Sequence, residues 1–407
     1  MKFEYTKLKE LTKKYGTSFY IFDKGLFVSN FRKFKKCFEK YYPKVEIAYA
    51  YKANYMPTLG DLIATDNGMI EVVSDLEYEI ALKSISANKI IFNGPVKTKY
   101  YIKKTLLNNS ILHIDSMCEL KYIKELLEDN EIKKASIGIR INFNVLNYKS
   151  RFGFNVENGD LDKVIKLIEN ESRINLISIH SHFTTKERSL DVFAIRSKKM
   201  AEVYKKLIKK HKIRYIDIGG GFFGEMPNLL SSKFNSYIPS FDEYAKCISS
   251  TIRNEIEEKP LPTLIVEPGI ALVGNTMSYV TQVLEIKRIN GINYAICDSN
   301  VNVVNPTRSS IEPFFYVVNS ENCISNDEYL LVGNTCMEND ILVNSYKGPL
   351  SVGSFIVFEN RGAYSSVFAP NFIMPAPPII GLDGEVYKIR DNADSILRVY
   401  EYNKKGQ

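Results

Sequence analysis

The sequence has few cysteines and histidines, and it contains no long apolar run. Its 407 residues include four histidines and six cysteines. The cysteines have no paired metal-ligand spacing, and we expect reduced thiols: Cys37, Cys118, Cys247, Cys297, Cys323 and Cys336. No segment approaches the roughly 18 apolar residues that span a bilayer, and residues 1–16 lack the apolar core of a signal peptide. We therefore expect a cytoplasmic protein without a membrane segment or a disulfide framework.

The positive charge of the chain is spread out rather than concentrated. The formal net charge is +7, but the lysines alternate with acids or lie on helix faces, as in KLKELTKK (7–14) and KKLIKKHK (205–212). Such patterns are typical of solvated helix surfaces, so we expect no nucleic-acid partner. The apolar fraction of 45% is ordinary for a globular protein of this length, which is long enough for one large domain and a smaller one.

Short strands alternate with helices over residues 26–273. The apolar strand patterns are VEIAYA, MIEVV, KIIF, ILHI, ASIGIRINF, RINLISIH, RYIDI and TLIV. Helical patterns of 10–15 residues lie between most of them, and the first helix carries an apolar stripe of Phe27, Phe31, Phe34 and Phe38. This alternation predicts an α/β fold, specifically a TIM-type (β/α)8 barrel of parallel strands.

The two ends of the chain have a different pattern. After about residue 275, six short β-rich segments are separated by Gly, Asn and Ser, with no long helical pattern between them. This predicts a C-terminal all-β domain, a sandwich or a barrel, over residues 274–407. Residues 1–25 contain a short strand and turn, TSFYIFDKG, and we expect this strand to join the β-domain.

The segment VEIAYAYKAN (45–54) places a lysine at the outgoing end of a predicted strand. Ala48 and Ala50 share the face of Lys52, which leaves room above the lysine for a flat and bulky group. Among apolar neighbours a lysine amine has a lowered pKa and can form a Schiff base. The alternative is a lysine that simply ends the strand in solvent.

Two later strands also end in residues suited to ligand binding. RYIDIGGGF ends in three glycines, at positions 219 to 221, whose backbone N–H groups can approach a phosphate closely; a tight turn is the alternative. IVEPGI places Glu267 at the end of an apolar strand, where a buried carboxylate needs a partner. A protonated ring nitrogen, an arginine or backbone amides would each serve.

The segment ISIHSHFTT places His180 and His182 on one face of a strand. Metal ligation would need a third ligand, and none stands out in the sequence, so we expect no metal site. Stacking of a histidine on a flat cofactor, or a histidine in the core, are the other interpretations. In a barrel, the residues that follow strands lie on one rim: Lys52, Glu71, His182, Gly219, Gly220, Gly221 and Glu267.

Seven stretches, in their order and spacing, resemble the barrel-type decarboxylases that use pyridoxal 5'-phosphate (PLP). They are YAYKAN, GMIEVVSDLE, IHSHFTT, YIDIGGGF, VEPG, GNTCMENDIL and NRGAYSSVFAPNF. This fold-type III family has an alanine-racemase-like barrel, and the chain most resembles its diaminopimelate decarboxylase branch, with ornithine and arginine decarboxylases as relatives. The resemblance covers nearly the whole chain. It implies PLP-dependent decarboxylation of an amino acid.

The resemblance also implies roles for individual residues. Lys52 would bind PLP as a Schiff base, His182 would stack on its ring, and Glu267 would pair with the pyridine nitrogen. The phosphate would be held by Gly219, Gly220, Gly221 and Tyr364. Positions near the cofactor would be Glu71, Glu77, Arg140 and Gly269. Cys336 matches a catalytic cysteine that reaches the active site of the opposite subunit, which implies a homodimer with shared active sites.

Three departures from the family pattern concern the substrate. Ile270 stands where the family has an arginine, and Met337 stands where an acid follows the cysteine. Glu338 is shifted by one residue from that position, and Arg308 lies near an expected Arg-Pro. Apolar side chains cannot satisfy a distal charge on the substrate. We therefore expect a non-standard or carrier-attached amino acid, in specialised biosynthesis, with a substrate site that includes Ile270, Arg308, Cys336, Met337, Glu338 and Tyr364.

Two alternatives to decarboxylation stay open at the level of sequence. An amino-acid racemase would use the same barrel and lysine, with an acid and a base on opposite faces of the substrate carbon. A non-catalytic homologue would bind and regulate a true enzyme.

Overall fold

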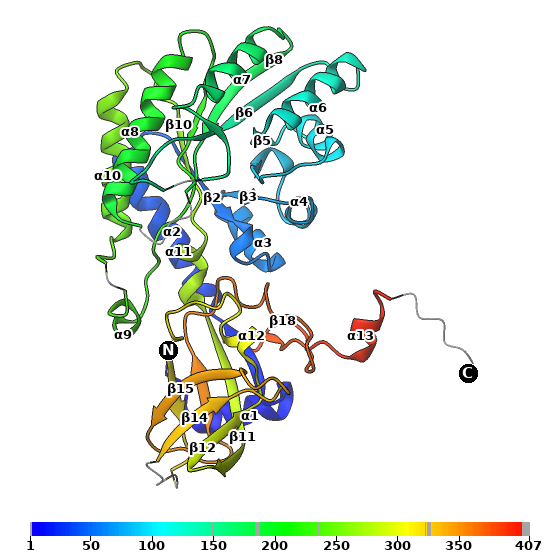
Figure 1. Cartoon of the computed structure of the whole chain (residues 1–407), viewed down its shortest axis with the longest axis vertical. Helices are drawn as coiled ribbons and strands as arrows, with labels where there is room; N and C mark the ends of the chain where they lie inside the picture. Colours follow the sequence, from blue (N-terminus) through cyan, green and yellow to red (C-terminus); the bar gives the residue numbers. More distant parts are fainter. Residues whose placement is uncertain are drawn as a thin grey trace, which may run out of the picture. The chain divides into compact units, whose positions relative to one another are not determined.

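The computed structural model describes residues 2–148, 150–183, 188–234, 236–321, 323 and 327–400. The chain forms two compact units (Figure 1). The first, which we call the barrel unit, comprises residues 28–225 and 235–272. The second, the β unit, comprises residues 1–27, 226–234 and 273–407. Within the described residues, no helix combines the length and the apolar character needed to cross a bilayer.

The barrel unit is built around a closed ring of eight parallel strands. In chain order these are β2 (Val45–Ala50), β3 (Met69–Val72), β4 (Ile90–Phe92), β5 (Ile111–Ile114), β6 (Ala135–Asn142), β8 (Ile174–His180), β9 (Tyr215–Asp217) and β10 (Thr263–Val266). Each strand pairs with the next in this order, and β10 pairs with β2 to close the ring. A short extra strand, β7 (Phe154–Asn155), pairs with β6. The predicted (β/α)8 barrel is therefore confirmed.

Helices surround the ring of strands, as Figure 1 shows. They are α2 (Lys24–Tyr41), α3 (Pro57–Thr65), α4 (Asp75–Ala81), α5 (Lys99–Leu107), α6 (Met117–Glu128), α7 (Asp160–Glu169), α8 (Leu190–Leu207), α10 (Phe241–Glu255) and the short α11 (Ile270–Val273), with single turns at η1 (Tyr51–Ala53) and η2 (Ala87–Lys89). The predicted phenylalanine stripe of α2 is buried. Its Phe34 ring lies 5.2 Å from the Phe222 ring and 5.0 Å from the Phe241 ring, which attaches α2 to the barrel.

Side chains from alternate strand positions fill the inside of the barrel. One cluster joins five strands: Ala48, Met69, Ile91, Ile111 and Ile265. Since Ala48 lies in this cluster, the alanine face of β2 points to the barrel interior. That is the face that the sequence pattern assigned to Lys52.

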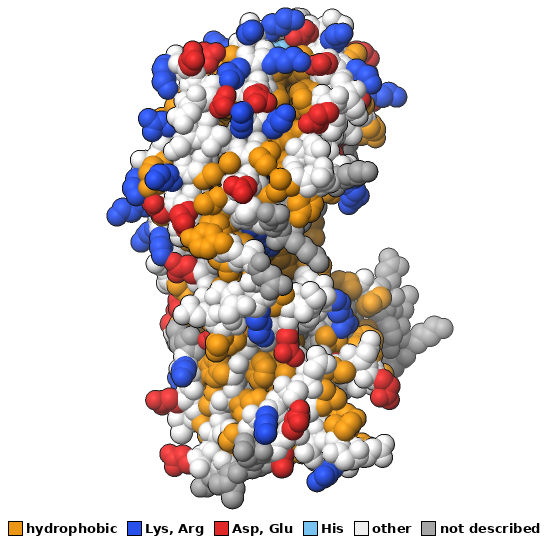
Figure 2. Space-filling view, turned by 60° about the vertical axis from the view of Figure 1, so that its left-hand side comes forward, with side chains coloured by type: hydrophobic (Ala, Val, Ile, Leu, Met, Phe, Trp, Pro, Cys, Tyr) orange, Lys and Arg blue, Asp and Glu red, His pale blue; other side chains and the backbone are white. Residues whose placement is uncertain are grey.

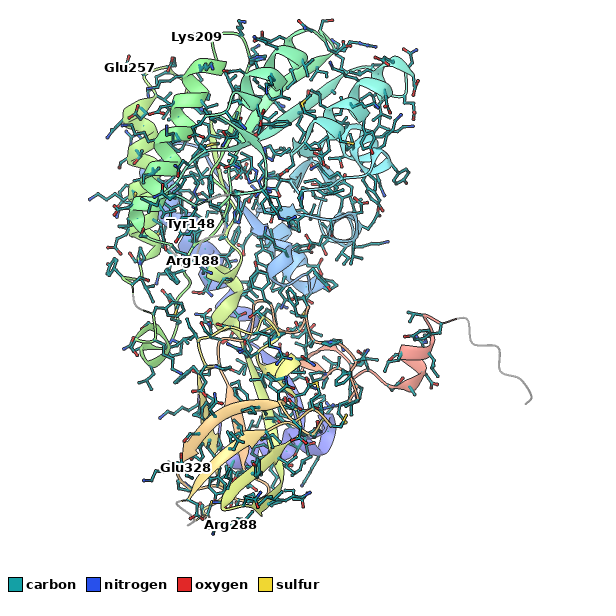
Figure 3. All side chains as sticks on the ribbon, in the orientation of Figure 1. Tyr148, Arg188, Lys209, Glu257, Arg288 and Glu328 are labelled. Carbon is teal, nitrogen blue, oxygen red and sulfur yellow. The ribbon has the colours of Figure 1, made fainter. Side chains whose placement is uncertain are left out.

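The two ends of the barrel differ in function in this fold class. Figure 3 shows Tyr148 and Arg188, in the loops after β6 and β8, at the opposite end from Lys209 and Glu257, which precede β9 and β10. The end with Tyr148 and Arg188 holds the carboxyl ends of the strands, where barrel enzymes place their active sites. The other end carries the lysine-rich segment 205–212.

Lysines of that segment pair with acids on neighbouring helices. Lys206 lies 2.6 Å from Asp162, and Lys210 lies 3.1 Å from Glu169. Figure 2 likewise shows basic and acidic side chains interspersed over this face of the molecule. This surface is a solvated one of mixed charge, as the sequence pattern predicted.

The β unit contains one mixed sheet. Its strands are β1 (Ser18–Phe22), β11 (Met277–Ile289), β12 (Ile292–Cys297), β13 (Phe315–Val318), β14 (Glu328–Val332), β15 (Ile341–Lys347), β16 (Phe355–Phe358), β17 (Ile379–Gly381) and β18 (Val386–Lys388). The order is β15-β14-β12-β11-β1-β17-β18, and β16 pairs with both β11 and β13. The β12–β14 and β1–β17 pairs are parallel and the others antiparallel.

Strand β1 pairs with β11 and β17 inside this sheet. Its Phe19 and Ile21 pack in a core cluster with Val280 and Val357. Short helices complete the unit: α1 (Tyr5–Tyr15), α9 (Asn228–Ser231), η3 (Gly274–Thr276), α12 (Val301–Val304) and α13 (Ala393–Leu397). We propose domain boundaries at 1–25, 26–273 and 274–407. The grouping of residues 226–234 with the β unit has no signal in the sequence.

Candidate active site

Lys52 follows the end of β2 and lies in the single turn η1. Tyr51 and Ala53 on either side are fully buried, whereas the Lys52 side chain is 26% exposed. The lysine Nζ forms an ion pair with Oε2 of Glu71, a carboxylate buried at β3. Register places Ala50 of β2 beside Glu71, which explains the contact. The sequence predicted apolar neighbours, and Tyr51 and Ala53 flank the lysine, but its amine contacts an acid from the adjacent strand.

Two buried acids near this lysine have raised pKa values. Burial raises the pKa of Glu71 to about 7, although the Lys52 ammonium opposes the shift. Burial also raises the pKa of Glu77 to about 7, although Oε2 of Glu77 accepts a 2.8 Å hydrogen bond from the N–H of Val73. Glu77 lies in the first turn of α4, where the Ser74 side chain accepts the N–H of Glu77 and caps the helix.

The raised pKa of Glu77 has a consequence for stability. Because its folded pKa is above the unfolded value of 4.5, its contribution is fully present below pH 4.5 and is lost as pH rises toward 7. We expect Glu77→Gln, which stays neutral, to gain about 3 kcal/mol over the wild type between pH 4.5 and pH 8, measured by urea unfolding of the PLP-free protein. Glu128→Gln, at an exposed position on α6, is the control. A Glu77→Gln effect that is constant across this pH range would contradict the prediction.

Glu267 follows β10 and is 2% exposed. Its Oε1 accepts a hydrogen bond from Nδ2 of Asn93, which follows β4. Its Oε2 lies 3.5 Å from Nε2 of His180.

His180 and His182 have different surroundings, because β8 ends at His180. The His180 ring stacks on the His113 ring at 5.0 Å between centroids. Nδ1 of His182 accepts the backbone N–H of Gly220 at 2.9 Å. Burial holds the pKa of both His180 and His182 well below the usual value, so both imidazoles are neutral.

The sequence pattern pairs His180 with His182 as possible metal ligands, but the structure places His180 beside two acids. His182 is not in the group that could hold a cation. Instead His180, Asp217 and Glu267 form that group, with one N or O atom of each residue lying within 4.8 Å of the others. Asp217 was part of the glycine motif but carried no assigned role.

The glycine segment lets three strand ends converge. Gly219 has φ +70, and a Cβ there would lie 2.8 Å from the Cβ of His182. A Cβ at Gly220 would lie 2.3 Å from the carbonyl oxygen of Glu267. Nη1 of the buried Arg196, from α8, donates to the carbonyl oxygens of Ile218 and Gly220 at 2.9 and 3.2 Å. These contacts fix the loop after β9 between β8 and β10.

Substitution at Gly220 tests this close approach. We expect Gly220→Ala to lower the free energy of unfolding by about 1–3 kcal/mol, because its methyl group must displace the Glu267 backbone. The measurement is urea unfolding of the PLP-free protein. Gly25→Ala is the matched control, since its Cβ would meet only Asp23 at an ordinary 3.5 Å. Equal effects of the two substitutions would contradict this interpretation.

Arg140 lies on β6 and is 7% exposed. Its Nη1 lies 3.3 Å from Oδ2 of Asp115, and its Nη2 donates to the carbonyl oxygen of His182 at 3.3 Å. Its guanidinium also covers the Phe152 ring at 4.7 Å. Arg140 therefore supports the segment that carries His182.

Gly269 and Ile270 follow β10, and Gly269 lies next to the Lys52 turn. A Cβ at Gly269 would lie 3.0 Å from the Cβ of Ala53. Ile270 begins α11. The Gly269 position therefore keeps the chain after Glu267 close to the lysine turn.

The remaining predicted site residues belong to the β unit. Cys336 and Glu338 are exposed, and Met337 is half-buried. Tyr364 has φ +51, a left-handed conformation that is rare for a bulky residue and that often occurs at functional sites. Nη2 of Arg308 donates to Oδ1 of Asn302 at 2.8 Å.

Met337 lines a pocket of about 330 Å³ in the β unit. Its lining carries no charged side chain: Asn302, Pro306, Met337, Phe368, Pro370, Asn371 and Phe372. The Phe368 ring lies 6.1 Å from the Tyr364 ring. The pocket therefore lies next to Tyr364, and Met337 in its lining directly follows Cys336 in the sequence.

Sequence reasoning missed four buried residues of the barrel site: Asn93, His113, Arg196 and Asp217. Asn93 and Asp217 do end or follow strands, so the rule that located Glu267 would have located them too. Arg196 is on a helix, and His113 is inside a strand, where position alone gives no signal.

The fold and this arrangement define a barrel enzyme with a lysine amine, a neutral imidazole and a buried carboxylate at the active end. The chain belongs to the family of PLP-dependent amino-acid decarboxylases. Residues 25–274 match its model "Pyridoxal-dependent decarboxylase, pyridoxal binding domain".

Several similar proteins are diaminopimelate decarboxylases. The protein from Methanocaldococcus jannaschii is 25% identical over 403 residues, covering 94% of this chain and 90% of that protein. The protein from Helicobacter pylori strain J99 is 28% identical over 395 residues, covering 94% of each. The crystal structure of the Helicobacter pylori enzyme complexed with L-lysine has a TM-score of 0.83, at 26% identity, over 96% of this chain and 98% of that chain.

The residues present fit PLP. Glu267 is a buried carboxylate that contacts the neutral side chains of Asn93 and His180, and a protonated pyridine nitrogen would give it a cation in direct contact. A Cβ at Gly221 would meet only one atom within 4 Å, the Phe183 carbonyl oxygen at 3.7 Å, so the backbone there is approachable. The lysine amine that the cofactor requires lies at the same end of the barrel.

Proposed function

We propose that this PLP-dependent decarboxylase acts on an amino acid whose distal end carries no charge, either a non-standard or a carrier-attached one. The observation that carries the proposal is the uncharged pocket around Met337. A distal ammonium or carboxylate placed there would lose its hydration without gaining an ion pair, which disfavours binding. Phe368 and Phe372 instead offer apolar surface.

We propose the following roles in the barrel unit. Lys52 would hold PLP covalently through its amine. PLP, when bound, supplies an electron sink for the electron pair that remains after CO2 leaves. His182 would stack on the cofactor ring as a neutral imidazole, a form that its hydrogen bond from Gly220 supports. Glu267, which is buried, would place a negative charge beside the ring nitrogen.

The other proposed roles concern the phosphate and the proton. Gly219, Gly220, Gly221 and Tyr364 hold the phosphate, and Glu71, Glu77, Arg140 and Gly269 lie around the cofactor. The Cys336 thiol delivers a proton to the substrate carbon after CO2 is lost. Since Cys336 is exposed on the β unit, it is available to a second subunit, which supports a homodimer with shared active sites.

The experiment is mass spectrometry of products formed in deuterated water with added PLP. The panel pairs meso-diaminopimelate and L-lysine with Nε-acetyl-lysine and norleucine, which have similar lengths but no distal charge. We expect CO2 loss with one deuterium gained, and the highest rate on a neutral member. Turnover of meso-diaminopimelate as the best substrate would overturn the proposal, and deuterium exchange without loss of CO2 would identify a racemase.

Met337→Glu provides a matched variant. We expect it to shift the preference by about tenfold or more toward substrates with a distal ammonium, because a carboxylate then replaces an apolar contact. The measurement is the ratio of kcat/KM for L-lysine and norleucine in both proteins. Glu338→Gln is the control, since it tests whether the neighbouring acid already recognises the amine. An unchanged ratio in Met337→Glu would contradict a substrate role for this position.

A further inference from the structure

We propose that Asp217 and Glu267 share one proton, that this proton resides on Asp217, and that Asp217 thereby acts as a positioning residue for an ionised Glu267. This inference rests on the proposed role of Glu267 toward the cofactor nitrogen. It assigns a role to Asp217, the acid of the RYIDIGGGF motif, to which the proposed function gives no role.

The two carboxyl groups come from adjacent parallel strands. Asp217 ends β9, and its partner in register is Ile265 of β10, two residues before Glu267. Since side chains two residues apart share a face of a strand, Glu267 points to the same side as Ile265, which is the barrel interior. Asp217 is 0% exposed and Glu267 is 2% exposed. Their oxygens belong to the group of atoms that lie within 4.8 Å of one another.

The hydrogen bonds of the pair leave one oxygen without a partner. Oδ1 of Asp217 accepts the N–H of Gly219 at 2.9 Å. Oε1 of Glu267 accepts from Asn93. Oδ2 of Asp217 is buried and has no hydrogen-bond donor among the described residues. A buried carboxylate oxygen without a donor is costly, whereas a protonated Oδ2 becomes a donor itself, with the Glu267 carboxylate as its acceptor.

The environment decides which acid holds the proton. Burial and the nearby Glu267 charge raise the pKa of Asp217 well above its usual value. Burial also raises the pKa of Glu267, but Lys52, Asp217, Arg140 and Asn93 all oppose that shift. The negative charge therefore stays on Glu267, and the proton on Asp217.

The charged or titratable groups that face the pair come from five elements: Lys52 of η1, Glu71 of β3, Arg140 of β6, His180 of β8 and Arg196 of α8. His180 does not supply the proton, because burial and nearby cations keep its imidazole neutral. The cations stabilise one negative charge on the pair but are not hydrogen-bonded to Oδ2 of Asp217.

The first test is infrared spectroscopy of the PLP-free protein at about pH 8.5, above the pKa of about 7 of Glu71 and Glu77. We expect the carbonyl band of a protonated carboxyl group in the wild type and its loss in Asp217→Asn. Absence of the band from the wild type, or its persistence in the variant, would overturn the proposal. So would one equivalent of tightly bound metal by elemental analysis of the purified protein.

The second test compares two variants by PLP titration, followed by absorbance. Asn keeps a neutral donor toward Glu267 and an acceptor for Gly219, so we expect Asp217→Asn to bind PLP within about threefold of the wild type. Asp217→Ala removes the donor, and we expect binding at least about tenfold weaker. Equal loss in both variants would indicate an ionised Asp217 and would overturn the proposal, as would no loss in either.

These readouts separate the inference from the proposed function. The infrared band is measured without PLP or substrate, so it does not depend on which amino acid is decarboxylated. If Asp217→Ala does not fold, as judged by circular dichroism, the band and the Asp217→Asn titration still decide. PLP binding by the wild type independently tests the proposed cofactor site.

Discussion

Lys52→Ala is expected to reduce decarboxylation at least about a thousandfold, which corresponds to about 4 kcal/mol in activation free energy. The family resemblance assigns the covalent attachment of PLP to this lysine, and the structure places its amine at the active end of the barrel beside Glu71. Without the amine, no side chain at this position would hold PLP covalently, and no amine would be available to release the product from it. The measurement is single-turnover CO2 release together with the visible absorbance of bound PLP.

Lys97 provides a matched control for the loss of a lysine from the same barrel. It is fully buried and lies 3.0 Å from Glu119. Lys97→Met is expected to lower stability, because Glu119 loses its partner, yet to retain the Schiff-base absorbance of PLP. Retention of that absorbance in Lys52→Ala, or its loss in Lys97→Met in a folded protein, would show that Lys52 is not the attachment point.

Glu267→Gln is expected to lower kcat by about 10²–10³-fold. Glutamine keeps the shape of the side chain and an oxygen that accepts from Asn93, but it carries no negative charge. The cofactor nitrogen then loses the counter-charge that favours its protonated form, and the negative charge that develops after CO2 loss is less well delocalised. The measurement is kcat under saturating substrate and PLP.

The control for Glu267→Gln is another buried acid of the barrel unit. Glu119 is paired with Lys97, and Glu119→Gln removes one negative charge without touching β10. We expect it to change stability while kcat falls by less than about threefold. A kcat for Glu267→Gln close to that of the wild type would exclude the proposed charge effect.

Much of the barrel could be predicted from the sequence, because each buried parallel strand is a short apolar run that ends in a polar residue or a glycine. That pattern located Lys52 and Glu267 by position alone. It could not assign the partners of these residues, since those depend on which strands are neighbours around the ring. Glu71 reaches Lys52 through the β2–β3 register, and Asn93 reaches Glu267 across the barrel interior.

Other parts of the candidate site were inaccessible to pattern reasoning. Arg196 supports the glycine loop from helix α8. Its position in the sequence is that of any buried residue on one face of a helix, so it carries no separate signal. Cys336 and Tyr364 were identified only through family resemblance, because neither lies at the end of a predicted barrel strand. The pocket at Met337 combines segments around residues 302–306 and 368–372, which no local pattern connects. The substrate therefore could not be derived from periodicity.

The position of β1 within its sheet constrains the order in which the chain can fold during synthesis. β1 ends at Phe22, yet one of its neighbours is β17, which begins at Ile379. The barrel strands, from Val45 to Val266, can all pair before β17 has left the ribosome. Until then, the apolar segment SFYIF keeps at least one unpaired edge, and such edges promote aggregation. A nascent chain stalled before residue 379 would thus need chaperone protection at its first strand. That strand is separated from the stalled end by nearly the whole sequence.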